Sequence, residues 1–209
     1  MVICWNIGHT FIDGFTVDEE NPIYDSRNGC NAIIETATNN IVATCKNSLI
    51  PNDVTVIGPY AYALWLGEHF VIPDNITALK EGAFNCCRFN TIHIPDGVKE
   101  IGPYCFFYCS NMHKVKLPDG LSRIEEKAFA NSGLQEVLIP DSATFIGEKA
   151  FAHCQSLQTA TIGSGVREIA AYAFKDCVEL QKVVSYIPAD KLTAIPAEEL
   201  IPENFNSAK

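Results

Sequence analysis

A tandem repeat with a period of roughly 22 residues constrains this chain more than any other feature of its sequence. An Ile/Leu-Pro step marks one place in each repeat, and an Ala/Cys-aromatic step marks a second place. The first series runs Ile50, Ile72, Ile94, Leu117, Ile139 and, with glycine replacing proline, Ile162. The aromatic series runs Tyr62, Phe84, Phe106, Phe129, Phe151 and Phe174. Because the intervals of both series lengthen and shorten by one position at the same repeats, the pattern predicts one structural unit stacked in tandem.

Each unit contains two short extended segments and one tight turn. In residues 134–151, Val137 and Ile139 alternate with outward residues, as in a strand with one buried face, and Pro140 ends it. The apolar pair Ala143 and Ile146 predicts a second extended segment on the opposite wall. The Ala-aromatic segment that follows is too short for a stable α-helix, which favours a single turn or a 3₁₀ element. Stacked units should therefore form parallel strand ladders and columns of buried side chains.

The nine cysteines include one such column. They are Cys4, Cys30, Cys45, Cys86, Cys87, Cys105, Cys109, Cys154 and Cys177. An odd number cannot pair completely within the chain, and no CxxC pair suggests zinc. Four of them, Cys87, Cys109, Cys154 and Cys177, occupy one repeat position, three residues after the aromatic residue. We interpret these four as buried thiols, because a reduced cysteine packs like a small apolar residue. Disulfides along the column are the alternative.

The repeat unit, apolar-x-x-Val-x-Ile-Pro-Asp-x-Val-x-x-Ile-Gly-x-x-Ala-Phe-x-x-Cys, resembles the BspA-like leucine-rich repeat family. The resemblance covers residues 50–184 closely, and residues 25–45 look like a longer repeat variant of that family. In that variant, segments 32–36 and 41–45 would form a β-hairpin with Asn39 and Asn40 at its turn. Residues 12–17 fit the strand pattern of the repeat just before the hairpin.

The expected fold is a leucine-rich repeat solenoid, mainly β, with short parallel strands, single-turn or 3₁₀ segments and an N-terminal β-hairpin repeat. We expect one domain over residues 1–209. Its expected parts are a partial repeat or cap (1–28), the hairpin-containing repeat (29–49), six tandem repeats (50–185) and a C-terminal cap or tail (186–209).

Composition narrows the possible functions. The net charge of −10 argues against nucleic acid as a partner, because phosphate binding needs a concentrated Lys/Arg surface. No apolar run reaches the roughly 18–20 residues of a membrane span. Gly163-Ser164-Gly165 lacks the GxSxG spacing, and the histidines lack metal-ligand spacing. The sequence therefore predicts no enzyme, no catalytic or metal-binding residues and no cofactor.

The family resemblance implies a role in recognition. Members are mostly exported or surface proteins of host-associated microbes, and those with an assigned role adhere to host proteins or to other cells. We expect a non-enzymatic binding module at the cell surface or outside the cell, with a protein or glycan partner such as a host matrix component. Residues 1–6 show no secretory signal, so the chain is either leaderless or an excerpt of a longer one. The alternatives are a structural spacer in a larger surface protein and an intracellular interaction scaffold; the sequence leaves the oligomeric state open.

Outward positions of the first extended segment also stack into columns. The candidate ligand-binding face consists of His69, His93, His113, Lys114, Lys116, Glu136 and Leu138. Its histidines and lysines would form a locally basic patch in an acidic protein, suited to an acidic protein segment or an anionic glycan. The alternative is that these are ordinary solvated side chains.

Overall fold

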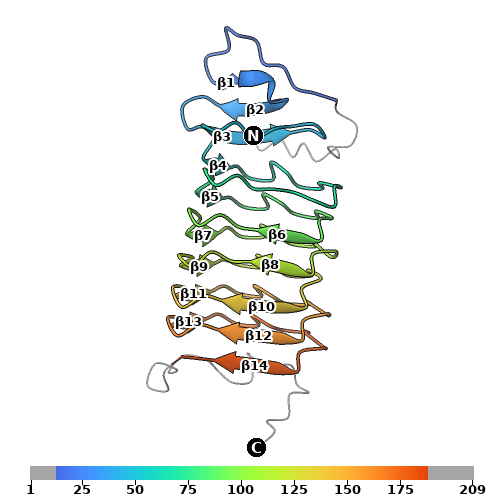
Figure 1. Ribbon diagram of the computed structural model, residues 1–209, viewed down its shortest axis with the longest axis vertical. Coiled ribbons are helices and arrows are strands. Elements are labelled where there is room, and N and C mark those ends of the chain that lie inside the picture. The colour runs from blue at the N-terminus through green and yellow to red at the C-terminus, as the bar shows by residue number, and fades with distance from the viewer. Residues whose placement is uncertain (1–12, 188–209) are drawn as a thin grey trace, which may run out of the picture.

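The computed structural model describes residues 13–187 as an elongated stack of rungs (Figure 1). It is a β-solenoid, as expected, and the only helix among these residues is the 3₁₀ turn η1 (Arg27–Gly29). Residues 1–12 and 188–209 lie outside the description, which leaves out part of the predicted N-terminal cap (1–28) and most of the C-terminal one (186–209), so both caps stay predictions. The strand expected at residues 12–17 is not formed by its described part, 13–17, which carries no regular secondary structure.

Two walls of the solenoid are made of strands. One wall is a nine-stranded sheet, made of β1 (Tyr24–Asp25), β2 (Ala32–Glu35), β3 (Asn40–Thr44), β4 (Val56–Ile57), β5 (Ala78–Leu79), β7 (Glu100–Ile101), β9 (Arg123–Ile124), β11 (Phe145–Ile146) and β13 (Glu168–Ile169), in that order. The other, which we call the strand face, carries β6 (Thr91–His93), β8 (Lys114–Lys116), β10 (Glu136–Ile139), β12 (Thr159–Ile162) and β14 (Lys182–Ser185). On the first wall, strands of consecutive repeats pair in parallel from β3 onward, and on the strand face β6 pairs in parallel with β8, and β12 with β10 and β14. The two extended segments of the predicted unit are thereby confirmed.

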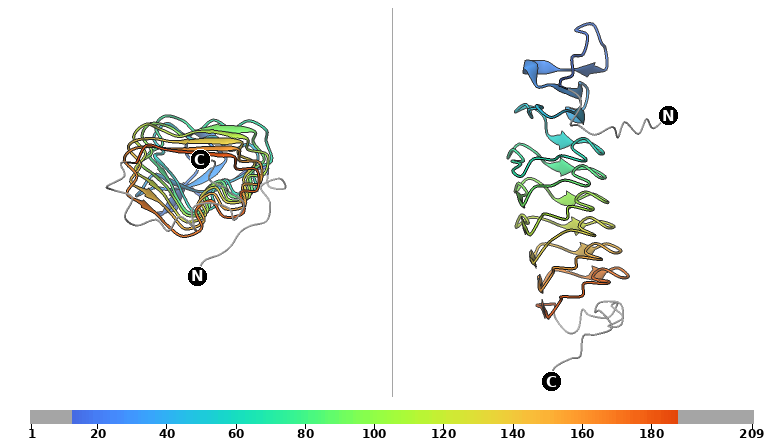
Figure 2. Two further views of the ribbon diagram at one scale, coloured as in Figure 1. Left: turned by 90° about the horizontal axis from the view of Figure 1, so that it is seen from below. Right: turned by 90° about the vertical axis from the view of Figure 1, so that its right-hand side faces the viewer.

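The third side is a ladder of turns, which closes the three-sided outline seen along the stack (Figure 2). In one rung the Ala150 N–H donates to the Gly147 oxygen (3.2 Å), whereas the Phe151 N–H donates to Ala173 in the next rung (2.8 Å). Lys149 and His153 adopt left-handed φ angles of 55° and 59°. This alternation of local and rung-to-rung bonds, with left-handed residues between them, prevents the regular 3₁₀ helix that was one expectation for this segment.

The interior holds the predicted columns. The six aromatic rings from Tyr62 to Phe174 are all at most 1% exposed, and consecutive rings stack with centroids 5.2–5.7 Å apart. The four thiols of the predicted column are also buried and unpaired. Each sulfur lies 3.1–3.2 Å from the carbonyl oxygen of the aromatic residue in the preceding rung, as Cys154 does with Phe129. A cysteine at this position thus fills space and contacts a buried backbone acceptor.

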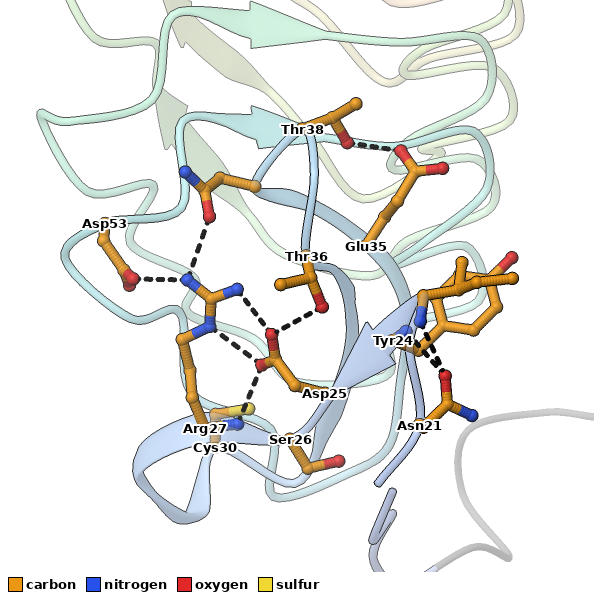
Figure 3. A network of polar contacts seen from close by, with 12 residues as sticks. Asn21, Tyr24, Asp25, Ser26, Arg27, Cys30, Glu35, Thr36, Thr38 and Asp53 are labelled. Carbon is orange, nitrogen blue, oxygen red and sulfur yellow. Dashed lines mark hydrogen bonds and ion pairs between the residues drawn. The ribbon is translucent and has the colours of Figure 1, made fainter. Parts of the chain in front are cut away.

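The β-hairpin is confirmed, although its strands begin and end slightly differently from the expectation. β2 and β3 pair antiparallel, β1 adds a further antiparallel strand, and β3 continues into the array by pairing in parallel with β4. Figure 3 shows the polar network at this junction. The Arg27 guanidinium bonds to Asp25 (2.5 and 2.8 Å), to Asn39 (2.9 Å) and to Asp53 of the first tandem repeat (2.5 Å). Hydrogen bonds from Arg27 lower the pKa of Asp25 to about 2.

The alternation between shorter and longer repeats has a structural consequence on the strand face. Strands separated by the longer interval pair regularly, as β6 with β8, β10 with β12 and β12 with β14. Where the interval is one position shorter, His69 forms only an isolated bridge with Thr91, and β8 and β10 do not pair. The loop before β10 is one residue shorter than the loop before β12. The strand ladder that we expected to be continuous is therefore interrupted between β8 and β10. The interruption coincides with the shorter loop, which changes the register in which β10 meets β8.

Candidate functional site

The strand face brings the seven predicted residues onto one wall. His93 lies on β6, Lys114 and Lys116 on β8, and Glu136 and Leu138 on β10. His69 bridges to Thr91 beside β6, and the His113 carbonyl accepts the Gln135 N–H (3.1 Å) across the interruption. All seven side chains are exposed. The predicted register holds within each sheet, since His93 faces Lys116 on the neighbouring strand.

One ion pair crosses the interruption between β8 and β10. Lys114 Nζ lies 3.7 Å from Glu136 Oε1, and both side chains are 67% exposed. An exposed pair of this kind contributes at most about 1 kcal/mol to stability and leaves both groups free to exchange partners. Glu136 therefore offsets part of the positive charge of the patch without burying it.

A shallow depression of about 440 Å³ spans this interruption. It is lined by Thr91, His113, Lys114, Gln135, Glu136, Gln158 and Thr159. Three of the seven predicted residues, His113, Lys114 and Glu136, thus line a common hollow, whereas His69, His93, Lys116 and Leu138 lie outside it. The surrounding amide and hydroxyl side chains supply both hydrogen-bond donors and acceptors, as a polar ligand requires.

The described cysteines differ in how easily their thiols ionise: hydrogen bonds with Cys177 and Ser132 lower the pKa of the fully buried Cys154, whereas three others are held in the thiol form. Burial raises the pKa of the Cys86, Cys87 and Cys105 thiols. A raised pKa keeps a thiol protonated, and the protonated form is a poor nucleophile. Within residues 13–187, no group of three or more His, Cys, Asp or Glu side chains is placed to hold a metal ion.

One feature of the surface escaped the sequence reasoning. The Pro-Asp steps indicate turns, but they also stack, so that four exposed carboxylates occupy equivalent places on consecutive rungs: Asp74, Asp96, Asp119 and Asp141. Ser164 takes the next place, and its N–H and hydroxyl donate to Asp141 Oδ1 (2.7 and 3.0 Å). These bonds lower the pKa of Asp141. This column could have been predicted from the sequence, because the Pro-Asp steps recur at the same interval as the strands that precede them.

The described part of the chain contains no helix both long and apolar enough to cross a membrane. No curated protein sequence matches the chain. Solved structures do resemble it, and the first is a leucine rich cell surface protein from Faecalibacterium prausnitzii A2-165, with 24% identity and a TM-score of 0.62. The pneumococcal vaccine antigen PcpA has 16% identity and a TM-score of 0.60. A leucine-rich repeat protein from Eubacterium ventriosum has 17% identity and a TM-score of 0.56.

These alignments cover 88%, 90% and 83% of this chain, but only 44%, 44% and 42% of the three structures. The chain therefore spans less than half the length of the proteins that it resembles, and the likeness concerns the fold. The sequence model of the BspA type leucine rich repeat region matches over residues 33–157 and 122–199, with six copies. Proteins built from such repeats are typically non-enzymatic scaffolds that mediate protein interactions. The combined matches extend over most of the sequence, and this chain belongs to the BspA type leucine rich repeat family.

Proposed function

We propose that this chain is a non-enzymatic binding module at a cell surface, and that its strand face engages an acidic protein segment or an anionic glycan. The observation that supports the proposal is the clustering of His69, His93, His113, Lys114 and Lys116 on one exposed wall, in a chain whose net charge is −10. Positive charges, here those of Lys114 and Lys116, gathered in an otherwise negative surface concentrate anionic ligands there. The surface location rests on the description of the Faecalibacterium protein as a cell surface protein.

The depression at the interruption supplies the polar contacts for such a ligand. Because β8 and β10 do not pair, the side chains of His113, Lys114 and Gln135 border a hollow rather than a continuous sheet. An anionic group seated there would compete with Glu136 for Lys114. Replacing Glu136 with glutamine should accordingly strengthen binding, since it removes the internal competitor while keeping the shape.

Heparin and poly-L-glutamate are suitable probes, representing a sulfated glycan and an acidic polypeptide. The test variant is Lys114→Glu with Lys116→Glu, and the matched control is Lys80→Glu with Lys175→Glu, which makes the same charge change at exposed positions outside the strand face. We expect the test variant to weaken binding about tenfold or more and the control about twofold or less. Equal weakening by both variants would show that only overall charge matters, and failure of the parent chain to bind either probe would contradict an anionic ligand.

The structure also suits a second candidate function, a rigid spacer in a larger surface protein. Its support is the continuous rung-to-rung hydrogen bonding from the hairpin to β13, which makes the array a stiff rod. A spacer would tolerate charge reversal on the strand face without losing its role. Deleting one whole repeat and measuring partner capture by the full-length surface protein separates the two functions.

A further inference from the structure

A second, larger depression lies on the strand face, over its C-terminal rungs. Its volume is about 650 Å³. The residues of interest in its lining are Leu138, Tyr186, Asp119, Asp141, Thr161 and Ser164. We call it the acidic depression, because among residues 13–187 its lining includes two carboxylates and no lysine, arginine or histidine. It lies toward the opposite end of the strand face from the His69 and His93 rungs, so the face changes chemical character along its length.

Two glycines bring the turn at 163–165 close to the preceding turn at the edge of this hollow. A Cβ added to Gly165 would lie 1.9 Å from the Asp141 oxygen, and one added to Gly163 would lie 2.5 Å from the Pro140 carbonyl carbon. The backbone of the turn at 163–165 therefore packs directly on the preceding turn, with no side chain from either glycine between them. Leu138, at an outward position of β10, and Tyr186 border the hollow and are 68% and 63% exposed. Exposed apolar side chains bordering a hollow are a feature of interaction sites.

The carboxylates at the rim are charged and lack basic partners. Asp141, like any exposed aspartate, is ionised at neutral pH, and the two bonds from Ser164 hold its carboxylate in place and lower its pKa further. No lysine or arginine of residues 13–187 forms an ion pair with Asp119 or Asp141. Lys99, whose Nζ lies beside Gly120, donates to the Asp96 carbonyl oxygen instead (3.2 Å).

We propose that the acidic depression binds an arginine side chain on an extended segment of a partner protein. The proposal rests on the function proposed above, in which the strand face is a binding surface, and it names a second, oppositely charged subsite there. The aliphatic stem of the arginine packs on Leu138, and its guanidinium stacks on the ring of Tyr186. Its planar fork then meets the carboxylates of Asp119 and Asp141, which stand on adjacent rungs. Lysine fits less well, because its ammonium makes neither the bidentate nor the stacked contact.

The experiment uses the ¹⁵N-labelled full chain and a blocked Ser-Arg-Ser-Arg-Ser peptide as the probe. Amide shifts should concentrate on residues 119, 138, 141, 164 and 186. The same peptide with citrulline in place of arginine is the matched ligand control, since it keeps the shape and removes the charge. We expect the citrulline peptide to bind about tenfold more weakly or not at all.

Two pairs of variants separate this site from general acidity. Asp119→Asn with Asp141→Asn should raise the peptide Kd about tenfold. Asp74→Asn with Asp96→Asn removes the same charge from the same column outside the depression, and it should raise Kd by no more than about twofold. Leu138→Ser with Tyr186→Ser, at unchanged charge, should also weaken binding several-fold. Equal effects of the two aspartate pairs, or equal affinity for the citrulline peptide, would overturn the proposal.

A neutral glycan is the competing ligand class, and chitotriose tests it. Shifts of the same amides by chitotriose and none by the arginine peptide would overturn the proposal in favour of a sugar site. If the arginine peptide fails while heparin or poly-L-glutamate still binds through Lys114 and Lys116, this inference fails alone. If all of these charged probes fail, the proposed function fails with it.

Discussion

The interior columns and the strand face are made by the same rungs, yet they vary very differently from one rung to the next. At the aromatic position all six rungs carry Tyr or Phe, and the rings stack at nearly constant spacing. On the strand face the equivalent positions run His69, Thr91, Lys114, Glu136, Thr159 and Lys182. An interior ring packs against rings above and below it, so its size is fixed by its neighbours. An outward side chain meets water and is free to vary, which lets successive rungs form a basic region and an acidic depression on one wall.

The largest loss of stability is expected for a substitution in the middle of the aromatic column. Phe129→Ala should lower the free energy of unfolding by about 3–5 kcal/mol, because Phe129 is fully buried between Phe106 and Phe151. Leu138→Ala, on the strand face, is the control and should change it by no more than about 0.5 kcal/mol. Urea denaturation of both variants measures the difference. Similar losses from the two would mean that interior and face do not differ energetically.

Backbone packing between turns gives the next largest expected effect. Gly165→Ala should destabilise the chain by about 1–3 kcal/mol, since the new methyl group would press on the Asp141 carbonyl. Ser142→Ala, at the same position of the preceding repeat, keeps its Cβ and loses only the bond to the Leu121 oxygen (2.6 Å). Its cost should be about 1 kcal/mol. Thermal melting of the two variants measures the difference. A larger drop in melting temperature for Ser142→Ala than for Gly165→Ala would contradict the close approach of the turns.

Removing a buried hydroxyl from the interior should stabilise the chain instead of destabilising it. Tyr62 Oη is buried and has no hydrogen-bond partner among residues 13–187, whereas the other five rungs carry phenylalanine at this position. Tyr62→Phe should therefore raise the free energy of unfolding by about 1 kcal/mol. Tyr104→Phe, which loses a bond to Glu126 (2.9 Å) on the half-buried turn side, should lower it slightly. A loss of stability in Tyr62→Phe would indicate that this hydroxyl has a partner such as internal water.

The hairpin junction predicts a pH dependence. The folded pKa of Asp25, about 2, lies below its usual 3.8, so its contribution is present above about pH 4 and is lost as the pH falls toward 2. The groups facing it are Arg27, which in turn bonds Asp53, and the Thr36 hydroxyl. Arg27→Met should cost no more than about 1 kcal/mol at pH 7 and flatten this acid-induced loss. Urea midpoints of the parent chain and of Arg27→Met at pH 7 and pH 2.5 provide the check. An equal fall in midpoint between the two pH values for both proteins would contradict the prediction.

The smallest effect on stability is expected on the strand face itself. Lys114→Glu with Lys116→Glu should change the free energy of unfolding by no more than about 0.5 kcal/mol per site, because both side chains are exposed. The same variant is expected to lose anionic probe binding, so stability and binding should separate. Thermal melting measured on the protein used for binding supplies the check. A large drop in melting temperature would remove the distinction between the two regions.

Much of the fold was predictable because the interior is periodic. The spacing of Pro140 and Phe151 with their counterparts predicted the rungs, the buried columns and the outward register. The site was predictable only in part. The sequence grouped His113, Lys114 and Glu136 on one wall, but it did not indicate that β8 and β10 fail to pair or that a hollow lies between them.

The repeat period alone indicates which side of each rung a residue faces, because it fixes direction once the chain stacks on itself. How closely neighbouring rungs approach became visible only in the folded molecule. Strands separated by 22 residues on the strand face lack the regular pairing of those separated by 23, and Gly163 and Gly165 let one turn pack directly on another. Such offsets depend on packing between residues about twenty positions apart, and a local pattern carries no information about that contact.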